Sequence, residues 1–239
     1  MLHTWLVQSK QTVVFTGAGM STESGLPDFR SSATGMWQGK DPRMFASTQA
    51  MEHNRDAFIQ FYRMRIAGLQ ACRPHLGHDI LAEWEKQGII HSIITQNVDG
   101  FHQQAGSRNV AELHGTLSTV HCSVCHRVYP SSRYLEETIC ECGGFLRPSV
   151  VLFGESLPEE ALNKADESIG QADLCIVLGS SLAVSPANWY PQIAKQNGAR
   201  VVIVNMEPTE LDEIADEVVH GQKIGPFLQQ LAEKVGSKR

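Results

Sequence analysis

The segment Gly17–Arg30 combines a glycine turn with residue types that bind nucleotides. Gly17 and Gly19 allow the chain to turn sharply and to approach a ligand without an intervening side chain. Ser21 stands where it can cap or follow the start of a helix, whose free N–H groups attract a diphosphate. A hydride-transfer fold would continue this helix, but a glycine and a proline soon interrupt it. The segment therefore predicts a nucleotide site for another reaction, and a tight strand-to-helix turn is the alternative.

Asp28, Phe29 and Arg30 follow the proline and add a carboxylate, an aromatic face and a guanidinium to the same segment. No acidic residue stands about 20 residues further on, at the end of a second strand, where a dehydrogenase binds the ribose. This absence also favours nucleotide chemistry other than hydride transfer.

Four cysteines fall within 21 residues in two close pairs. They are Cys122, Cys125, Cys140 and Cys142. In a reducing compartment such a cluster favours a metal site over disulfides. Four thiolates complete the tetrahedral shell of a structural Zn²⁺ and leave no open position for water. Because the second pair is Cys-x-Cys rather than Cys-x-x-Cys, His121 and His126 are possible substitute ligands, and reduced cysteines without a metal are the alternative.

Polar side chains with catalytic potential follow two further predicted strands. Gln96, Asn97 and Asp99 come directly after the apolar run Ile89–Thr95, at the strand end where open α/β sheets bind ligands. Their amide and carboxylate groups suit a nicotinamide carboxamide or a ribose. His114 ends another short strand, and a neutral imidazole there can take a proton near physiological pH. Taken singly, the asparagine and aspartate could be turn residues and the histidine a satisfied polar group.

These residues require a scaffold that brings distant strand ends to one edge. Apolar and β-branched runs predict strands at 12–16, 89–95, 109–113, 150–153, 174–178, 200–205 and 218–219. Apolar spacing and breaker residues predict helices at 54–71, 78–87, 158–170, 186–197 and 226–235, and a loop at 31–48. Strands that alternate with helices predict an α/β fold, a Rossmann-like doubly wound parallel sheet. Residues 116–148 break this pattern and predict a small insert folded around the metal.

The composition excludes several classes of protein. A chain of 239 residues can bury one α/β core with a small insert. Its net charge of −6 argues against a general nucleic-acid surface, which needs clustered lysines and arginines. No apolar stretch predicts a membrane span, and residues 1–10 do not resemble a signal peptide. We therefore expect a cytoplasmic protein, with a monomer favoured, that binds neither nucleic acid nor membranes.

Taken together, the motifs resemble those of the sirtuins, which are NAD-dependent protein-lysine deacylases. The motifs that carry the resemblance are the glycine segment with its Pro-Asp-Phe-Arg end, Thr95–His102, His114-Gly115, the four cysteines, Phe153–Glu155 and Gly179–Ser181. They span most of the chain. The resemblance implies a cleft between two domains. These are a Rossmann-type domain of residues 1–30, 76–115 and 150–239, and a small domain of residues 31–75 and 116–149.

The resemblance also implies which residues bind the NAD co-substrate and carry the reaction. The NAD residues would be Gly17, Ala18, Gly19 and Ser21 at the diphosphate, Asp28, Phe29 and Arg30 by the reacting ribose, Gln96, Asn97 and Asp99 at the nicotinamide, and Gly179, Ser180, Ser181, Asn205, Glu207 and Lys223 at the adenosine. His114 would be the general base, with Asn97 and Asp99 beside it. In the family reaction the acyl oxygen of the lysine attacks ribose C1′ as nicotinamide leaves. The histidine then activates the 2′-hydroxyl, which gives free lysine and O-acyl-ADP-ribose, and the zinc takes no part.

The pair Tyr62 and Arg65, with Ala46 upstream, resembles the sirtuin branch that removes malonyl and succinyl groups as well as acetyl. There the tyrosine and arginine bind the acyl carboxylate, and the small alanine leaves room for the longer chain. Spacing alone, three residues apart on one helix face, favours an aromatic anchor beside a solvated charge. The resemblance further implies that the acylated protein binds as an extended strand between Val150–Glu155, which contains Phe153, Gly154 and Glu155, and Ser181–Ser185.

Two other functions stay open on the sequence. A mono-ADP-ribosyltransferase could use the same NAD pocket, and a non-catalytic zinc module could bind NAD or ADP-ribose as a sensor. The histidine at position 114 disfavours the sensor, because binding alone needs no base. Two features depart from many sirtuins, namely the Cys140-x-Cys142 spacing and the small side chains of Leu182–Ser185.

Overall fold

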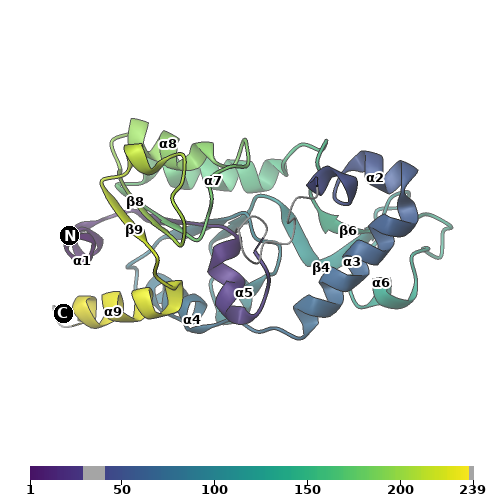
Figure 1. Cartoon of the computed structure of the whole chain (residues 1–239), viewed down its shortest axis with the longest axis horizontal. Coiled ribbons are helices and arrows are strands. Elements are labelled where there is room, and N and C mark those ends of the chain that lie inside the picture. Colours follow the sequence, from purple (N-terminus) through teal and green to yellow (C-terminus); the bar gives the residue numbers. More distant parts are fainter. Residues whose placement is uncertain (29–40, 237–239) are drawn as a thin grey trace.

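A computed structural model of the chain describes residues 1–28 and 41–236. Figure 1 shows two lobes, a larger one that contains both termini and a smaller one that contains helices α2, α3 and α6. No helix in this described part of the chain has the length and apolar character to cross a membrane.

The larger lobe is built on a six-stranded sheet with the order β3-β2-β1-β7-β8-β9, in which all neighbours pair in parallel. Its strands are β1 (Thr12–Thr16), β2 (Ser92–Thr95), β3 (Val110–Glu112), β7 (Leu174–Leu178), β8 (Arg200–Asn205) and β9 (Glu217–His220). β1, β2 and β7 are buried along their whole length because helices cover both faces. The chain runs outward in opposite directions from β1 and β7, so their carboxyl ends flank a topological switch point.

Helices form two hydrophobic cores, one on each face of this sheet. They are α1 (Leu2–Gln8), α4 (Leu76–Lys86), α5 (Phe101–Ala105), α7 (Glu159–Gln171), α8 (Trp189–Gln196) and α9 (Ile224–Gly236). Val14 packs in one core with Leu81 of α4 and Leu228 of α9. Its neighbour Phe15 packs in the other core with Ile169 of α7, because successive side chains of a strand point to opposite faces.

The smaller lobe joins two separate parts of the chain around a third core. Its elements are α2 (Thr48–His53), α3 (Arg55–Gln70), β4 (Gly115–Cys122), β5 (Val128–Pro130), α6 (Arg133–Glu136) and β6 (Leu146–Val150), with the antiparallel sheet order β5-β4-β6. Phe58 and Tyr62 of α3 pack there with Leu117 and Tyr134 of the cysteine-bearing segment. Three short 3₁₀ helices complete the described chain, η1 (Ala18–Ser24), η2 (Pro42–Met44) and η3 (Asp212–Ile214).

The observed elements confirm most of the predicted ones, with two corrections. β1, β7 and β8 have the predicted bounds, and α3 differs by one residue at each end. The strand predicted at 89–95 begins only at Ser92, because Ile89 turns back and donates its N–H to the Trp84 carbonyl at 2.8 Å. The run predicted at 150–153 is not a strand of the parallel sheet, since β6 ends at Val150 and pairs antiparallel with β4. Residues 31–40 of the predicted loop lie outside the described residues, and α1, α2 and α5 were not predicted.

Candidate active site

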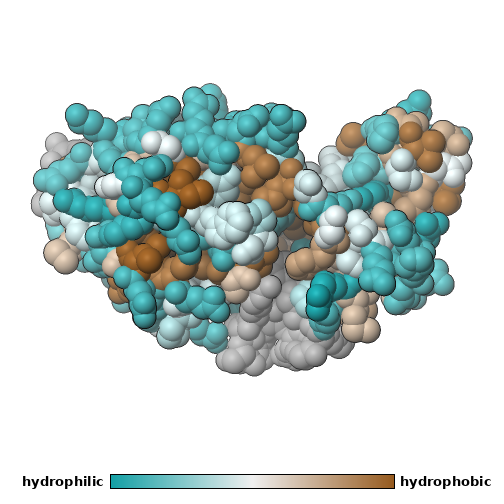
Figure 2. All heavy atoms as spheres, turned by 90° about the horizontal axis from the view of Figure 1, so that it is seen from above, coloured by the Kyte–Doolittle hydropathy of each residue, from teal (hydrophilic) through white to brown (hydrophobic). Residues whose placement is uncertain are grey.

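A cleft of about 870 Å³ lies between the two lobes. Figure 2 shows the surface hollowed there, with hydrophobic residues on the walls. The predicted site residues that line it are Gly17, Ala18, Gly19, Asp28, Ala46, Tyr62, Arg65, Gln96, Asn97, His114, Phe153, Gly154, Glu155, Gly179, Ser180, Ser181, Asn205, Glu207 and Lys223. Ser21 and Asp99 are buried beside the cleft rather than on its wall. Phe29 and Arg30 lie outside the described residues.

The loops after β1 and β7 interlock at the switch point through their glycines. Gly19 donates its N–H to the Gly179 carbonyl at 2.8 Å. A Cβ on Gly17 would lie 2.8 Å from the Gly179 oxygen, and one on Gly19 would lie 2.8 Å from the Gly179 Cα. Gly179 itself has a φ of 61°, and its Cβ would lie 2.4 Å from the Met20 nitrogen. Only glycine fits here, and the backbone that it exposes to the cleft suits a phosphate group.

A buried polar network lies behind the nicotinamide-binding residues proposed from the sequence. Ser21 donates its hydroxyl to Asp99 Oδ2 at 2.7 Å, and Asn97 Nδ2 donates to Ser21 Oγ at 3.2 Å. The Phe101 N–H donates to Asp99 Oδ1 at 2.9 Å. Burial raises the pKa of Asp99, although these donors and the Arg65 guanidinium act in the opposite direction. The network therefore fixes the Asn97 amide at the cleft wall from behind.

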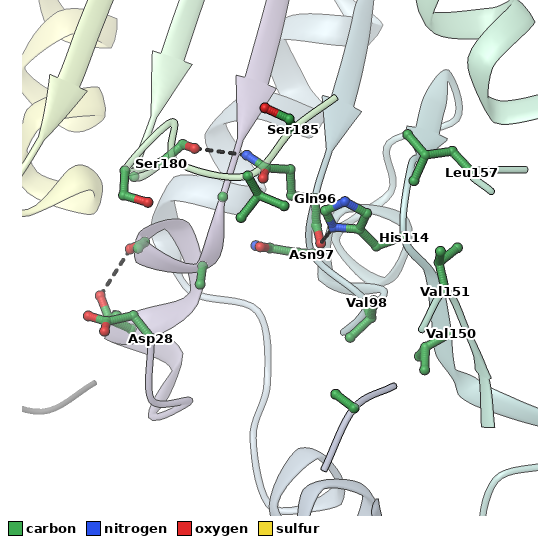
Figure 3. Close-up of a pocket in the computed structure, with 18 of the residues that line it drawn as sticks. Asp28, Gln96, Asn97, Val98, His114, Val150, Val151, Leu157, Ser180 and Ser185 are labelled. Carbon is green, nitrogen blue, oxygen red and sulfur yellow. Dashed lines mark hydrogen bonds between the residues drawn. The ribbon is translucent and has the colours of Figure 1, made fainter. Parts of the chain in front are cut away.

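His114 presents one ring nitrogen to the cleft in the form that a base requires. Its Nδ1 lies 3.0 Å from the Gln96 carbonyl oxygen, and because a carbonyl only accepts, Nδ1 carries the proton. Nε2 is then the unprotonated nitrogen. Burial lowers the pKa of His114, although the bond to Gln96 opposes the shift, so the neutral ring dominates at pH 7. Figure 3 shows the ring between Asn97 and the Val150–Val151 segment.

Gln96 also connects the ends of two strands across the cleft floor. Its Nε2 donates to Ser180 Oγ at 2.8 Å (Figure 3), and Ser180 Oγ accepts from the Leu182 N–H at 3.2 Å. At the end of β8, Asn205 Nδ2 donates to the Glu207 carbonyl at 2.7 Å. The carboxyl ends of the neighbouring strands β2, β1, β7 and β8 thus form one continuous wall, as expected for parallel strands.

The small lobe contributes Ala46, Tyr62 and Arg65 to the opposite side of the cleft. The Tyr62 ring is buried, which raises its pKa to about 12, and the nearby Arg65 guanidinium partly offsets this. The Arg65 guanidinium carbon lies 5.8 Å from the Tyr62 ring centre. Arg65 is half-buried at the cleft rather than on an open helix face. This placement differs from the solvated charge that spacing alone favours.

The four cysteines converge in the small lobe with the dimensions of a tetrahedral zinc site. Their sulfur atoms all lie within 4.8 Å of one another, with Cys122–Cys142 at 3.4 Å and Cys125–Cys140 at 3.7 Å. Four ligands at a Zn–S distance of about 2.3 Å place their sulfurs about 3.8 Å apart. The N–H groups of Cys125 and Val124 point at the Cys122 sulfur and lower the pKa of this thiol to about 6. The Cys-x-Cys pair therefore fits a zinc ligand set, with His121 and His126 not needed.

Part of the apolar wall of the cleft was not identified from the sequence. Val151 and Val184 belong to the two segments expected to flank the substrate strand, but Val98, Leu157 and Leu162 also line the cleft and were not singled out. Figure 3 labels Val98, Val151 and Leu157. Such residues carry no signal in a single sequence, because a valine in a cleft and a valine in the core have the same type. Only their position after strand ends could have suggested them.

Comparisons with known proteins agree over almost the whole chain. The model of the Sir2 family matches residues 17–186. NAD-dependent protein deacetylase 1 of Geobacillus kaustophilus is 59% identical over 235 residues, which cover 98% of this chain and 97% of that protein. NAD-dependent protein deacylase 2 of Pyrobaculum aerophilum is 43% identical and covers 96% of this chain and 93% of its own length.

Solved structures of Sir2 enzymes also match the chain over almost its whole length. A Sir2 enzyme solved for its mechanism and regulation superposes with a TM-score of 0.91 at 41% identity, over 100% of this chain and 97% of that one. A Sir2 complex with a p53 peptide and NAD⁺ superposes with a TM-score of 0.89 at 36% identity, over 99% and 98% of the two chains.

Proposed function

This chain belongs to the Sir2 family, and we propose that it uses NAD to remove acyl groups from lysine side chains of proteins. The products are free lysine, nicotinamide and O-acyl-ADP-ribose. One observation carries the proposal. The unprotonated Nε2 of His114 belongs to the same cleft as the glycine loops at the switch point. A site that only bound a nucleotide would have no use for this base.

NAD binding is assigned to the wall formed by the larger lobe. The diphosphate is proposed to lie against the exposed backbone of Gly17–Gly19, with Ser21 behind it. The nicotinamide half is assigned to Gln96, Asn97 and Asp99, and the adenosine half to Gly179, Ser180, Ser181, Asn205, Glu207 and Lys223. Asp28, Phe29 and Arg30 complete the proposed set. Support comes from the continuous wall that the described members of this set form at the carboxyl ends of the strands.

His114 is assigned the proton transfer of the reaction. NAD supplies the ribose C1′, which bonds to the acyl oxygen of the substrate lysine as nicotinamide leaves. His114 then accepts the proton of the ribose 2′-hydroxyl at Nε2, and the 2′-oxygen attacks the former acyl carbon. Water completes the release of lysine, and the acyl group stays on ADP-ribose. The Gln96 carbonyl holds the ring orientation and stabilises the imidazolium that forms, because it accepts from Nδ1.

The substrate protein is proposed to bind as an extended strand in the same cleft. Val150–Glu155 line this cleft, and so do Ser181, Val184 and Ser185 of the Ser181–Ser185 segment. An added strand would form main-chain hydrogen bonds with both segments, which accepts many sequences. Phe153 and Gly154 are the proposed contacts on one side. The Cys122, Cys125, Cys140 and Cys142 thiolates would hold a structural Zn²⁺, which takes no part in the chemistry.

Acyl groups that end in a carboxylate are proposed as substrates in addition to acetyl. Ala46, Tyr62 and Arg65 lie together at the small-lobe side of the cleft. A guanidinium binds a carboxylate through two parallel hydrogen bonds, and a phenol can donate a third. The small alanine leaves volume for the longer succinyl or malonyl chain.

The test uses two peptides that differ only in acetyl or succinyl on one lysine, with nicotinamide release and peptide mass as readouts. Arg65→Met is expected to lower kcat/KM for the succinyl peptide at least tenfold, since a charge-assisted hydrogen bond contributes about 1.5–3 kcal/mol. The acetyl peptide should be spared. Arg63→Met is the matched control, because Arg63 donates instead to the carbonyls of Tyr134 and Glu136 away from the cleft.

The other outcomes of this test would each support a different function. Equal losses on both peptides, or no desuccinylation by the wild type, would restrict the protein to acetyl groups. Radiolabel from NAD on the protein itself would favour an ADP-ribosyltransferase. Absence of turnover with either peptide would favour a sensor.

A further inference from the structure

A partly buried ion pair lies at one wall of the cleft, with its arginine buried and its glutamate half-buried. Arg147, on β6, is 8% exposed, and its two Nη atoms bind the two carboxylate oxygens of Glu155. The Nη2–Oε2 distance is 2.9 Å. Such a bidentate arrangement fixes both the direction and the distance between the two side chains. Glu155 is the last residue of the Val150–Glu155 segment and Arg147 precedes its first residue, so the pair encloses the segment.

The pair also binds the backbone between its two members. Arg147 Nη2 donates to the Val150 carbonyl at 2.9 Å, and Glu155 Oε2 accepts from the Leu152 N–H at 2.8 Å. Three points of a six-residue cleft wall are thereby tied to one guanidinium–carboxylate unit. The left-handed Gly154, with a φ of 100°, lets the chain turn back so that Glu155 can reach Arg147.

This same wall is hydrogen-bonded to the two functional ends of the cleft. The Val151 N–H donates to the His114 carbonyl at 2.9 Å, and the Phe153 N–H donates to the Ala46 carbonyl at 2.9 Å. The segment therefore sets the spacing between the proposed base and the proposed acyl pocket. Both charges of the pair also act on the Tyr62 hydroxyl, because Arg147 lowers the pKa of Tyr62 and Glu155 raises it.

We infer that the Arg147–Glu155 ion pair is a positioning element for the substrate strand. It holds residues 150–155 in the conformation that pairs with an extended acyl-lysine peptide and keeps the acyl pocket in register with His114. The inference rests on the proposed deacylase function. It assigns Glu155 to positioning rather than to direct contact with the substrate, since both of its carboxylate oxygens are bound within the protein.

Loss of the Glu155 charge leaves the buried Arg147 guanidinium without its counter-ion, so the wall must rearrange to solvate it. Loss of Arg147 releases the Glu155 carboxylate from the same wall. Glu155→Gln preserves the shape of the side chain but removes the charge. We expect this variant to raise the KM for an acetyl-lysine peptide at least tenfold, while the KM for NAD stays within about twofold. Arg147→Met should change the two KM values in the same way. Arg147→Lys, which keeps the charge but not the fork, should fall between Arg147→Met and the wild type.

The matched control is Lys195→Met. It breaks a different ion pair, with Asp216 at 2.7 Å, and neither residue lines the cleft. Its peptide KM should equal that of the wild type. Binding of a fluorescent acetyl-lysine peptide, followed by anisotropy, and thermal unfolding by circular dichroism accompany the kinetics. If Arg147→Met unfolds at the assay temperature, Glu155→Gln and Arg147→Lys decide the question.

The outcomes separate the inference from the function on which it rests. Active wild type together with unchanged peptide KM in Glu155→Gln would overturn the positioning role alone. Parallel increases in the KM for peptide and in the KM for NAD would also overturn it, because they indicate general damage to the fold. A wild type that releases no nicotinamide from NAD in the presence of either the acetyl or the succinyl peptide would refute the deacylase proposal, and the inference with it.

Discussion

Replacement of Gly179 by alanine should weaken NAD binding about 100-fold at a modest cost in folding stability. The new Cβ would lie 2.4 Å from the Met20 nitrogen and 2.5 Å from the Gly19 carbonyl carbon. These are backbone atoms, so no side chain can rotate away. Since unbonded heavy atoms prefer separations of about 3.5–4.0 Å, the two loops must part by about 1 Å.

The size of the effect follows from two separable costs. The φ of 61° at Gly179 costs alanine about 1–2 kcal/mol of folding stability. The displacement of the loop adds a binding cost, since misplacement of a binding group by about 1 Å can reduce function about 100-fold. A 100-fold weaker Kd corresponds to about 2.7 kcal/mol.

Gly198→Ala provides the matched control. Gly198 has a φ of 89°, but a Cβ there would meet nothing within 4 Å. This variant should lose a similar 1–2 kcal/mol of stability in urea unfolding, as a left-handed alanine does, and bind NAD normally. Isothermal titration with NAD measures the Kd of each protein. A Gly179→Ala protein that binds NAD within threefold of the wild type would refute the assignment of these loops to NAD binding.

Three other predictions follow from the site and its surroundings. His114→Ala should lower kcat for deacylation by about 10²–10⁴ while the NAD Kd stays within about twofold; near-normal turnover would exclude His114 as the base. Removal of zinc by a strong chelator should lower the melting temperature and make the Cys122 thiol reactive, because metal binding contributes to folding; identical melting curves and thiol counts would exclude a structural metal. Burial lowers the pKa of His78 to about 2 and of His102 to about 3. Below pH 6.5 the unfolded chain therefore binds two protons at these histidines that the folded chain does not. The free energy of unfolding should decrease as the pH is lowered, by up to about 2.7 kcal/mol per pH unit; equal unfolding free energies at pH 7.5 and pH 5 would contradict this.

The sequence predicts the central strands well because they are buried on both faces. β1, β7 and β8 are continuous apolar runs with a glycine or a polar residue after them, and few other structures have this pattern. The same physics explains the errors. Ile89 and Ile90 are as buried as a strand yet form a turn, and Val150 is equally apolar in an antiparallel sheet. An apolar run predicts that a segment is buried, but it does not predict with which strand the segment pairs.

Much of the candidate site was predicted for a geometric reason. Residues that follow parallel strands must meet at one sheet edge, so the sequence alone is enough to group Gly17, Gln96, His114 and Gly179. Contacts that depend on the path of a turn could not be predicted from the sequence. Glu155 reaches Arg147 only because Gly154 adopts a left-handed conformation, and nothing in the spacing of the two charges indicates this.

The strand order also has a consequence for how the protein is made. β1 pairs with β7, so Phe15 lies beside Val177 in the middle of the sheet although most of the chain separates them. During synthesis β1 leaves the ribosome early and can pair with β2 once Ser92–Thr95 has emerged, but its other edge stays open until Leu174–Leu178 has emerged. Contacts of such long sequence separation form slowly, and an unpaired apolar strand edge is prone to aggregate in the meantime. The nascent chain is therefore at its most vulnerable through the whole of the cysteine-bearing segment, and it acquires a nucleotide pocket only when the sheet closes around β1.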